Sequence, residues 1–273
     1  MNILDKIIAQ KHIEVAERSS LVPVKLLEKS PFFEGKAVSM KKYVCDPEKS
    51  GIISEFKRKS PSKGLINGSA SVEAVSIGYM QAGASALSIL TDTDFFGGSN
   101  ADLKDARKFN FCPILRKDFV VDEYQILEAK SIGADCILLI AAALEPARLK
   151  ELAAFAKSLG LEVLMEVHDG EELERSLCDD LDLVGVNNRN LKTFDVSLDI
   201  SMELVDRIPS DFVKISESGI SSPETLVTLK KAGFDGFLIG ENFMRSSRPE
   251  QAAYTFIKEY KKLLAKETAL NNA

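Results

Sequence analysis

The stretch Lys130-Ser-Ile-Gly-Ala-Asp-Cys-Ile-Leu-Leu-Ile140 ends a helix-like pattern, turns at a glycine and then enters a short apolar run. Glycine at a helix end adopts the left-handed conformation that stops a helix at little cost. A short apolar run after it is typical of a strand buried on both faces, as parallel sheets require. Three other segments repeat the pattern: Met80-Gln-Ala-Gly-Ala-Ser-Ala-Leu-Ser-Ile-Leu90, Lys157-Ser-Leu-Gly-Leu-Glu-Val-Leu-Met-Glu166 and Lys231-Ala-Gly-Phe-Asp-Gly-Phe-Leu-Ile-Gly240. The repetition indicates alternating helices and parallel strands.

Extending the pattern in both directions predicts eight strands. They are Gly51–Phe56, Ala86–Leu90, Pro113–Lys117, Cys136–Ile140, Glu162–Glu166, Leu183–Asn187, Val213–Glu217 and Gly236–Gly240. Helical patterns fill the gaps, and suitable caps begin two of them, at Ser71 and at Ser222-Pro223. Eight strand–helix units in residues 49–273 predict an α/β fold, a single closed (β/α)8 (TIM) barrel. A doubly wound sheet is the alternative.

Residues 1–48 stand outside this count. Ile3, Leu4, Ile7 and Ile8 fall on one helical stripe, which suits a helix packed against the barrel. The segment is too short to build its own core. We therefore expect residues 1–48 to form an N-terminal helical extension packed on the barrel, and residues 49–273 to form the catalytic barrel, within one structural domain.

Composition points to a small-molecule partner. The net charge of −6 disfavours binding to nucleic acid. Charged residues interrupt every apolar run, so we expect neither an export signal nor a membrane span. The four cysteines, which lie far apart, lack the paired spacing of metal ligands. The sequence thus predicts reduced thiols, no metal and a cytoplasmic location.

Polar side chains stand at the ends of several predicted strands, where a barrel interior should be apolar. They are Glu55 and Lys57, Lys117, Glu166, Asn187 and Glu217. The carboxyl ends of barrel strands converge on the face that carries active sites. Residues two apart in a strand share a face, so these side chains should project into the barrel mouth. We expect neighbouring charges there to shift pKa values, making a lysine a useful acid and a glutamate a useful base near neutral pH.

Glycine-containing loops follow the last two predicted strands. They are Ser216-Glu-Ser-Gly-Ile220 and Leu238-Ile-Gly-Glu-Asn242. Glycine lets backbone N–H groups approach an anion, and barrels often bind phosphate at this position. The pair of loops therefore predicts a phosphate site.

Taken together, these stretches resemble indole-3-glycerol-phosphate synthase. The segments that carry the resemblance are Ile52-Ile-Ser-Glu-Phe-Lys-Arg-Lys-Ser-Pro-Ser-Lys-Gly64, Leu90-Thr91 through Phe96-Gly-Gly-Ser99, Pro113-Ile-Leu-Arg-Lys-Asp-Phe-Val-Val-Asp122, Leu161-Glu-Val-Leu-Met-Glu-Val-His168, Gly185-Val-Asn-Asn-Arg-Asn-Leu191 and Ser216-Glu-Ser-Gly-Ile220. They run in order from about residue 50 to 245. The N-terminal extension also suits this family.

The resemblance implies a carboxy-lyase of tryptophan biosynthesis. Its substrate would be 1-(2-carboxyphenylamino)-1-deoxyribulose 5-phosphate, which loses carbon dioxide and water as it closes to indole-3-glycerol phosphate. No redox change occurs, so the resemblance implies no cofactor. Association with other enzymes of the pathway remains open.

The resemblance also implies roles for individual residues. Lys117 resembles the general acid of ring closure, and Glu166 with Lys57 resembles the acid–base pair of dehydration. Glu55 and Glu217 would hold the lysines and substrate hydroxyls. Asn187 and Arg189 match positions that orient the substrate and the glutamates. Further substrate- and phosphate-binding positions would be Ser60, Phe96, Ser218, Gly219, Gly240 and Glu241, with Phe95 competing with Phe96 for the arene pocket and the Glu241 side chain turned away from phosphate.

Two other functions stay open. A class I aldolase would form a Schiff base on Lys117 or Lys57. A catalytically inactive barrel would only bind a sugar phosphate. We expect His168, two residues after Glu166, to support its neighbours and not to react.

Overall fold

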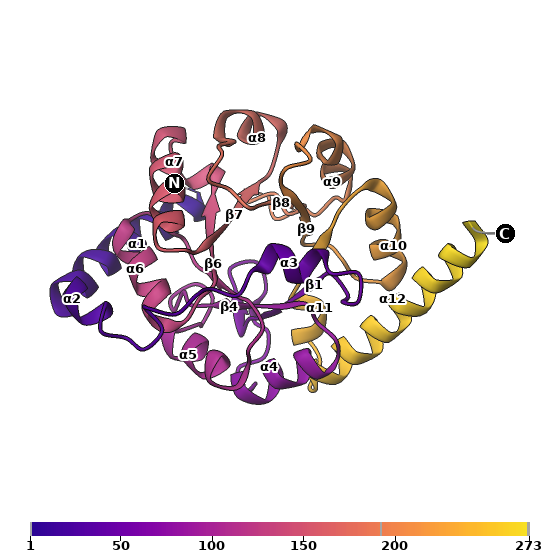
Figure 1. Cartoon of the computed structure of the whole chain (residues 1–273), viewed down its shortest axis with the longest axis horizontal. Coiled ribbons are helices and arrows are strands. Elements are labelled where there is room, and N and C mark those ends of the chain that lie inside the picture. The colour runs from indigo at the N-terminus through magenta and orange to yellow at the C-terminus, as the bar shows by residue number, and fades with distance from the viewer. Residues whose placement is uncertain (1, 192, 272–273) are drawn as a thin grey trace.

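The computed structural model describes residues 2–191 and 193–271 and contains one closed barrel of eight parallel strands (Figure 1). The strand order around the barrel is β1-β10-β9-β8-β7-β6-β5-β4. The barrel strands are β1 (Ile52–Phe56), β4 (Ala86–Leu90), β5 (Ile114–Lys117), β6 (Cys136–Ile140), β7 (Glu162–Val167), β8 (Leu183–Asn187), β9 (Val213–Glu217) and β10 (Gly236–Ile239). This architecture confirms the predicted TIM barrel.

Every barrel strand begins and ends within one residue of its predicted bounds. The glycine at the turn of each of the four repeated segments has positive φ: Gly83, Gly133, Gly160 and Gly233. Both predicted caps are present, since the Ser71 side chain accepts from the backbone N–H of Ala74 and Pro223 occupies the first turn of its helix. The glycine turns and the helix caps therefore end and begin these helices where the sequence pattern predicted.

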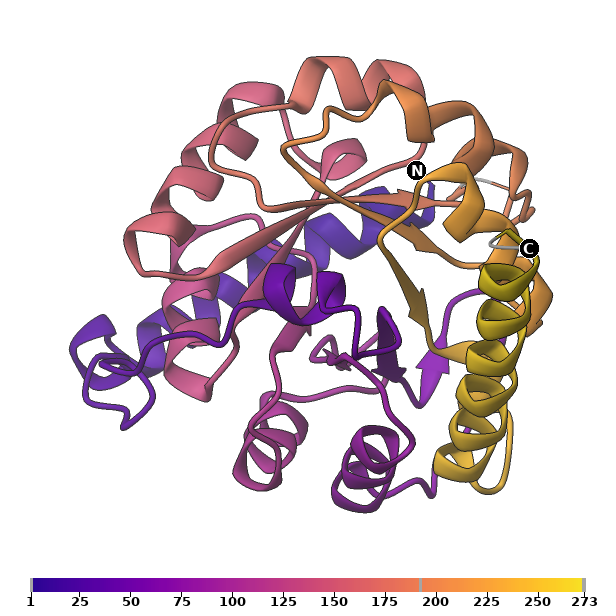
Figure 2. The same ribbon diagram turned by 45° about the vertical axis from the view of Figure 1, so that its right-hand side comes forward.

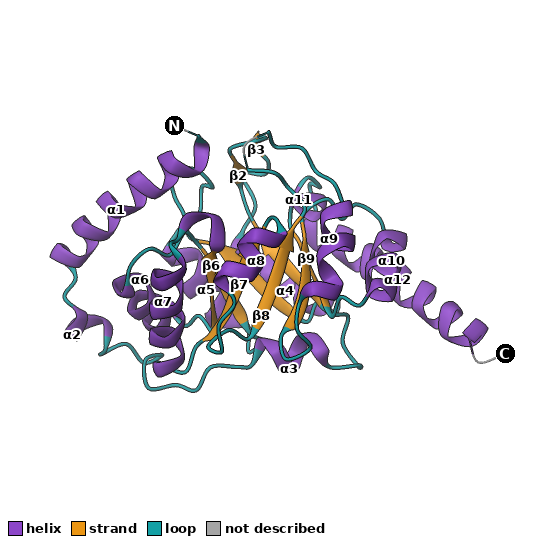
Figure 3. Ribbon diagram, turned by 90° about the horizontal axis from the view of Figure 1, so that it is seen from above, coloured by secondary structure: helices purple, strands orange, loops and turns teal. Residues whose placement is uncertain are grey.

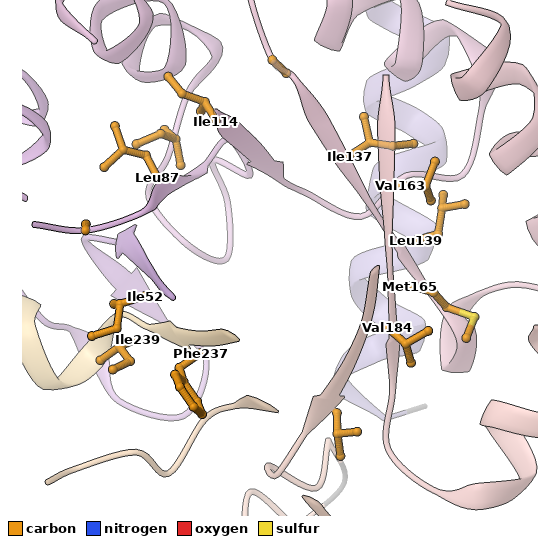
Figure 4. Packing of buried hydrophobic residues seen from close by; sticks show 14 of the residues in the cluster. Ile52, Leu87, Ile114, Ile137, Leu139, Val163, Met165, Val184, Phe237 and Ile239 are labelled. Atoms are coloured by element: carbon orange, nitrogen blue, oxygen red, sulfur yellow. The ribbon is translucent and has the colours of Figure 1, made fainter. Parts of the chain in front are cut away.

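Helices surround the barrel and bury its outer face. They are α4 (Val72–Gln81), α5 (Asn100–Phe109), α6 (Glu123–Ile132), α7 (Pro146–Ser158), α8 (Gly170–Ser176), α9 (Asp199–Leu204), α10 (Pro223–Ala232), the short α11 (Glu241–Met244) and α12 (Pro249–Asn271). Figure 4 shows strand residues such as Ile137 and Val163 in this outer apolar layer. The long α12, yellow in Figure 2, packs against α4 and α10.

The barrel interior is filled by the alternate residues of the same strands. Leu115 and Leu164 belong to this inner cluster, so Lys117 and Glu166, two residues further on, point along the interior toward the mouth. Helix α3 (Met40–Cys45) closes the other end, where Met40 and Val44 join the inner cluster. A Cβ at Gly236 would lie only 2.4 Å from a methyl carbon of Val44, so glycine there gives this helix room.

Two further segments lie at the mouth. Figure 3 shows helix α1 (Ile3–Leu21) and the hairpin of β2 (Lys59–Ser60) and β3 (Gly64–Leu65) on one side of the strands, with α3 on the opposite side. A four-residue helix, α2 (Val24–Leu27), follows α1. The division of the chain after residue 48 stays a prediction. Within the described ranges, no helix is both long and apolar enough to cross a bilayer.

Candidate active site

Lys117 stands at the centre of the barrel mouth between two carboxylates. Its Nζ lies 3.0 Å from Oε2 of Glu166 and 2.6 Å from Oε2 of Glu217. The three side chains come from β5, β7 and β9, and all point inward. Both glutamates are almost fully buried. One lysine thus bridges two carboxylates across the barrel.

Neighbouring side chains fix Glu166 from two more sides. Its Oε1 accepts a hydrogen bond from Asn187 Nδ2 at 3.1 Å and lies 3.4 Å from His168 Nε2. The other ring nitrogen of His168 lies 3.1 Å from Oε2 of Glu172. His168 therefore stands between two carboxylates, as expected for a supporting residue. A second lysine–glutamate pair lies beside this group, with Lys57 Nζ 2.7 Å from Oε1 of the buried Glu55.

The charges of the central group shift one another's pKa values. Burial lowers the pKa of Lys117, but Glu217 and Glu166 outweigh burial and raise it above its usual value. Burial raises the pKa of Glu166, yet Lys117 and His168 outweigh burial and lower it to about 2. Burial raises the pKa of Glu217 to about 7, because the pull of Lys117 is partly cancelled by the charge of Glu166.

The expectation of a lysine with a near-neutral pKa is wrong for Lys117. Two carboxylates around one cation hold its proton more firmly, whereas a lowered pKa needs burial without such partners. The two glutamates differ in their pKa values. Glu166 stays ionised and Glu217 accepts a proton more readily.

The loops after β9 and β10 form the other end of the site. Ser218 and Gly219 both have positive φ, at 67° and 74°. A Cβ at Gly240 would lie 2.4 Å from Oε1 of Glu55, so glycine lets the loop pass directly over that carboxylate. Asn188 anchors the loop after β9: its Nδ2 donates to the backbone oxygens of Glu217 and Ser218 at 2.9 and 3.2 Å.

Glu241 directly follows Gly240 and lines this end of the pocket. Arg189 Nη2 lies 3.3 Å from its Oε2, and Lys63 Nζ lies 4.0 Å from its Oε1. The carboxylate is thus paired with cations. Asn187 holds the backbone of Arg189 in place, because the N–H of Arg189 donates a hydrogen bond to Asn187 Oδ1 at 3.0 Å.

An apolar wall completes a pocket of about 260 Å³. Phe96 lines the pocket and packs on Phe119, with ring centroids 5.8 Å apart. Of the two neighbouring phenylalanines it is therefore Phe96 that faces the cavity. Ile3 and Ile7 of α1 line the same pocket, so the N-terminal helix forms part of the site.

The pocket brings together all the residues to which the resemblance gave a catalytic or binding role, apart from the alternative Phe95. Its lining includes Glu55, Lys57, Ser60, Phe96, Lys117, Glu166, Asn187, Arg189, Glu217, Ser218, Gly219, Gly240 and Glu241. Sequence reasoning missed Asn188 and Phe119. Asn188 directly follows Asn187 at the end of β8, and Phe119 lies two residues after Lys117 at the end of β5. Patterns in a single sequence do not show which of the residues after a strand support the site. In the described part of the chain, no group of three or more His, Cys, Asp or Glu side chains is placed to hold a metal ion.

Comparison with known proteins identifies the family. A family model described as indole-3-glycerol phosphate synthase matches residues 4–256. A protein of Bacteroides thetaiotaomicron named indole-3-glycerol phosphate synthase is 48% identical over 257 residues, which cover 94% of this chain and 98% of that protein.

Solved structures match at much lower identity. The crystal structure of KGPDC from Streptococcus mutans has a TM-score of 0.58 at 14% identity and covers 77% of this chain and 97% of its own. A structure described as native KDPGal has a TM-score of 0.57 at 15% identity, with coverage of 80% and 96%. These likenesses show the fold alone. The sequence matches, which span nearly the whole chain and agree with the site in the barrel mouth, show that the chain belongs to the indole-3-glycerol phosphate synthase family of tryptophan biosynthesis.

Proposed function

We propose that the pocket is that of a carboxy-lyase that converts 1-(2-carboxyphenylamino)-1-deoxyribulose 5-phosphate into indole-3-glycerol phosphate, carbon dioxide and water. The observation that carries this proposal is the position of Lys117. Its ammonium group lies between two buried glutamates, with an aromatic wall on one side and glycine-containing loops on the other. The pocket can therefore hold the arene of the substrate at the aromatic wall, its ketone at Lys117 and its phosphate at the glycine-containing loops.

Lys117 acts as the acid of ring closure. The ring carbon that bears the carboxylate attacks the ketone carbon, a carbon–carbon bond forms, and the ketone oxygen takes a proton from Nζ. An alkoxide is far more basic than an amine, so the raised pKa of Lys117 still permits this transfer. Loss of carbon dioxide then returns the electron pair of the broken bond to the ring and restores its aromaticity.

Glu166 and Lys57 carry out the dehydration. Glu166 is ionised and takes the proton from the carbon next to the hydroxyl-bearing carbon. Lys57, paired with Glu55, gives the departing hydroxyl its proton. Glu217 lines the pocket beside Lys117, so its carboxylate holds this lysine next to the hydroxyls of the substrate.

The two ends of the pocket bind the two ends of the substrate. Phe96 contacts the arene, and Asn187 orients Glu166. Phosphate meets the loops that contain Ser60, Ser218, Gly219 and Gly240, while Arg189 and Glu241 pair at their rim. A cytoplasmic location and association with other enzymes of the pathway remain predictions from sequence.

Indole fluorescence tests the proposal directly, because the chain contains no tryptophan and so adds no indole signal of its own. Purified protein mixed with the carboxyphenylamino substrate should give a rising signal. Lys117→Met should lower kcat by about 10²-fold or more and leave KM nearly unchanged. Lys150→Met, which changes an exposed lysine of α7, is the matched control. A Lys117→Met variant within about tenfold of the wild type would remove Lys117 from the acid role.

Borohydride separates this function from that of an aldolase. Acid catalysis leaves no Schiff base, so borohydride should trap no adduct with the substrate. A reduced adduct on Lys117 or Lys57 would instead assign a class I aldolase mechanism. Tight binding of the substrate with no signal would assign a barrel that only binds sugar phosphates.

A further inference from the structure

Lys11 of helix α1 is buried among carboxylates although it lies in the N-terminal extension. The residue is 1% exposed. Its Nζ lies 2.9 Å from Oδ2 of Asp92, 3.0 Å from Oδ1 of Asp118 and 2.9 Å from Oε2 of Glu14. A lysine so deeply buried is held there by its partners, since burying an unpaired cation costs several kcal/mol. The contacts join α1 to two loops of the barrel mouth.

Asp92 connects Lys11 to the loop that carries Phe96. Oδ1 of Asp92 accepts hydrogen bonds from the backbone N–H groups of Phe95 and Phe96, at 2.8 and 3.1 Å. Its other carboxylate oxygen, Oδ2, is buried and meets Lys11. Lys11 therefore holds the carboxylate that fixes the direction of the Phe96 backbone.

Asp118 connects Lys11 to the end of β5. It directly follows Lys117, and its Oδ1 accepts from the backbone N–H of Phe119 at 2.8 Å. Phe119 is the ring on which Phe96 packs. Burial raises the pKa of Asp118, but Lys11 and Arg116 outweigh burial and lower it to about 2, so this carboxylate stays ionised at neutral pH.

One face of α1 thus serves two purposes. Ile3 and Ile7 line the pocket, and Lys11 lies one turn beyond Ile7 on the same face. The helix places apolar side chains over the arene end of the pocket and a cation beneath the two phenylalanines that form its wall.

We propose that Lys11 is a positioning residue for the arene end of the site. Lys11 holds Phe96 and Phe119 in contact and fixes the backbone next to Lys117. This inference rests on the proposed function, because it assigns the phenylalanine wall to the arene of the carboxyphenylamino substrate. Lys11 touches no substrate and acts through Asp92 and Asp118. Its removal loosens the arene end and leaves the phosphate loops in place.

The test compares Lys11→Met in the full-length chain with Lys6→Met, which changes an exposed lysine of the same helix. In the indole fluorescence assay, Lys11→Met should lower kcat/KM by about 10- to 100-fold, chiefly through KM, because small displacements of positioning groups have effects of this size. The inhibition constant of inorganic phosphate, which probes the other end of the pocket, should stay within about twofold. Lys6→Met should match the wild type in both.

A second variant keeps the test independent of folding. Lys11→Met/Asp92→Asn restores the local balance of charge but not the connection between α1 and the loop that carries Phe96. The melting temperature of this double variant should return toward that of the wild type while KM stays high. The inference is overturned if Lys11→Met keeps a wild-type KM, if the constant for phosphate weakens in parallel, or if the double variant regains the wild-type KM. A wild-type protein without turnover would instead overturn the proposed function itself.

Discussion

Replacing Lys117 with methionine should destabilise the protein in a way that depends on pH. Methionine keeps most of the side-chain volume and removes the cation that Glu166 and Glu217 share. In the wild type, Lys117 is the strongest influence lowering the pKa of both glutamates. Without it, the pKa of Glu166 loses the largest influence that lowers it and should return toward the usual value of 4.5.

The structure sets the size of this effect. The pKa of Glu166 is about 2 in the folded wild type and should return toward the usual value of 4.5 in the variant. Because one pKa unit corresponds to about 1.4 kcal/mol, the lost stabilisation amounts to about 3 kcal/mol for this group. The sign follows from proton binding. The depressed pKa of Glu166 stabilises the folded wild type fully above the unfolded value of 4.5, and this stabilisation is lost as the pH falls toward 2, so the difference between wild type and variant is largest above pH 4.5.

Denaturant unfolding at about pH 3 and about pH 7 measures the difference. The free energy of unfolding lost in Lys117→Met should be about 3 kcal/mol at the higher pH and fall to about 1 kcal/mol at the lower pH. Lys150→Met should stay within about 0.5 kcal/mol of the wild type at both. An equal loss at the two pH values would show that the glutamates do not depend on Lys117 for their ionisation, and would refute the pKa assignment.

Three other substitutions test separate parts of the site. Gly240→Ala places a Cβ 2.4 Å from Oε1 of Glu55, so it should displace that carboxylate and lower kcat/KM by about tenfold or more, while circular dichroism stays unchanged. Burial lowers the pKa of His168, but Glu172 and Glu166 outweigh burial and raise it. The charge of His168 in turn lowers the pKa of Glu166, so His168→Asn should raise the pKa of Glu166. The acid limb of the kcat–pH profile, which reports ionisation of Glu166, should therefore move to higher pH. Asn188→Ala removes the two hydrogen bonds from this side-chain amide to the backbone oxygens of Glu217 and Ser218, and it should cost about 2 kcal/mol in denaturant unfolding, with weaker inhibition by phosphate. An unchanged value in any of these three measurements contradicts the contact behind it.

The strands could be predicted because each is apolar on both faces and follows a glycine turn. The same period-two reasoning indicated that Lys117 and Glu166 point into the mouth, since Leu115 and Leu164 pack in the barrel interior. The direction of the pKa shift of Lys117 could not be predicted. It depends on how many carboxylates lie within about 3 Å of Nζ, and residue types alone do not give that number.

Other features left no signal in the sequence. The β2–β3 hairpin has two residues in each strand, too few for an alternating pattern. Lys11 interrupts an apolar stripe near the N-terminus, and such a lysine is usually solvated. Its partners Asp92 and Asp118 are distant in sequence and meet it only because α1 crosses the mouth. The choice of Phe96 over Phe95 depends on how Asp92 turns the loop, a tertiary effect.

Helix α3 seals the end of the barrel away from the catalytic lysine with Met40 and Val44. The molecule is thereby divided into a closed floor that supplies folding free energy and an open rim built from loops. Substitutions at the floor should be selected for stability alone, whereas changes in the rim alter chemistry at little cost to folding. An evolving lineage could thus change its substrate specificity through substitutions in the loops of the rim. The floor, where Val44 packs against Gly236, would keep the fold intact.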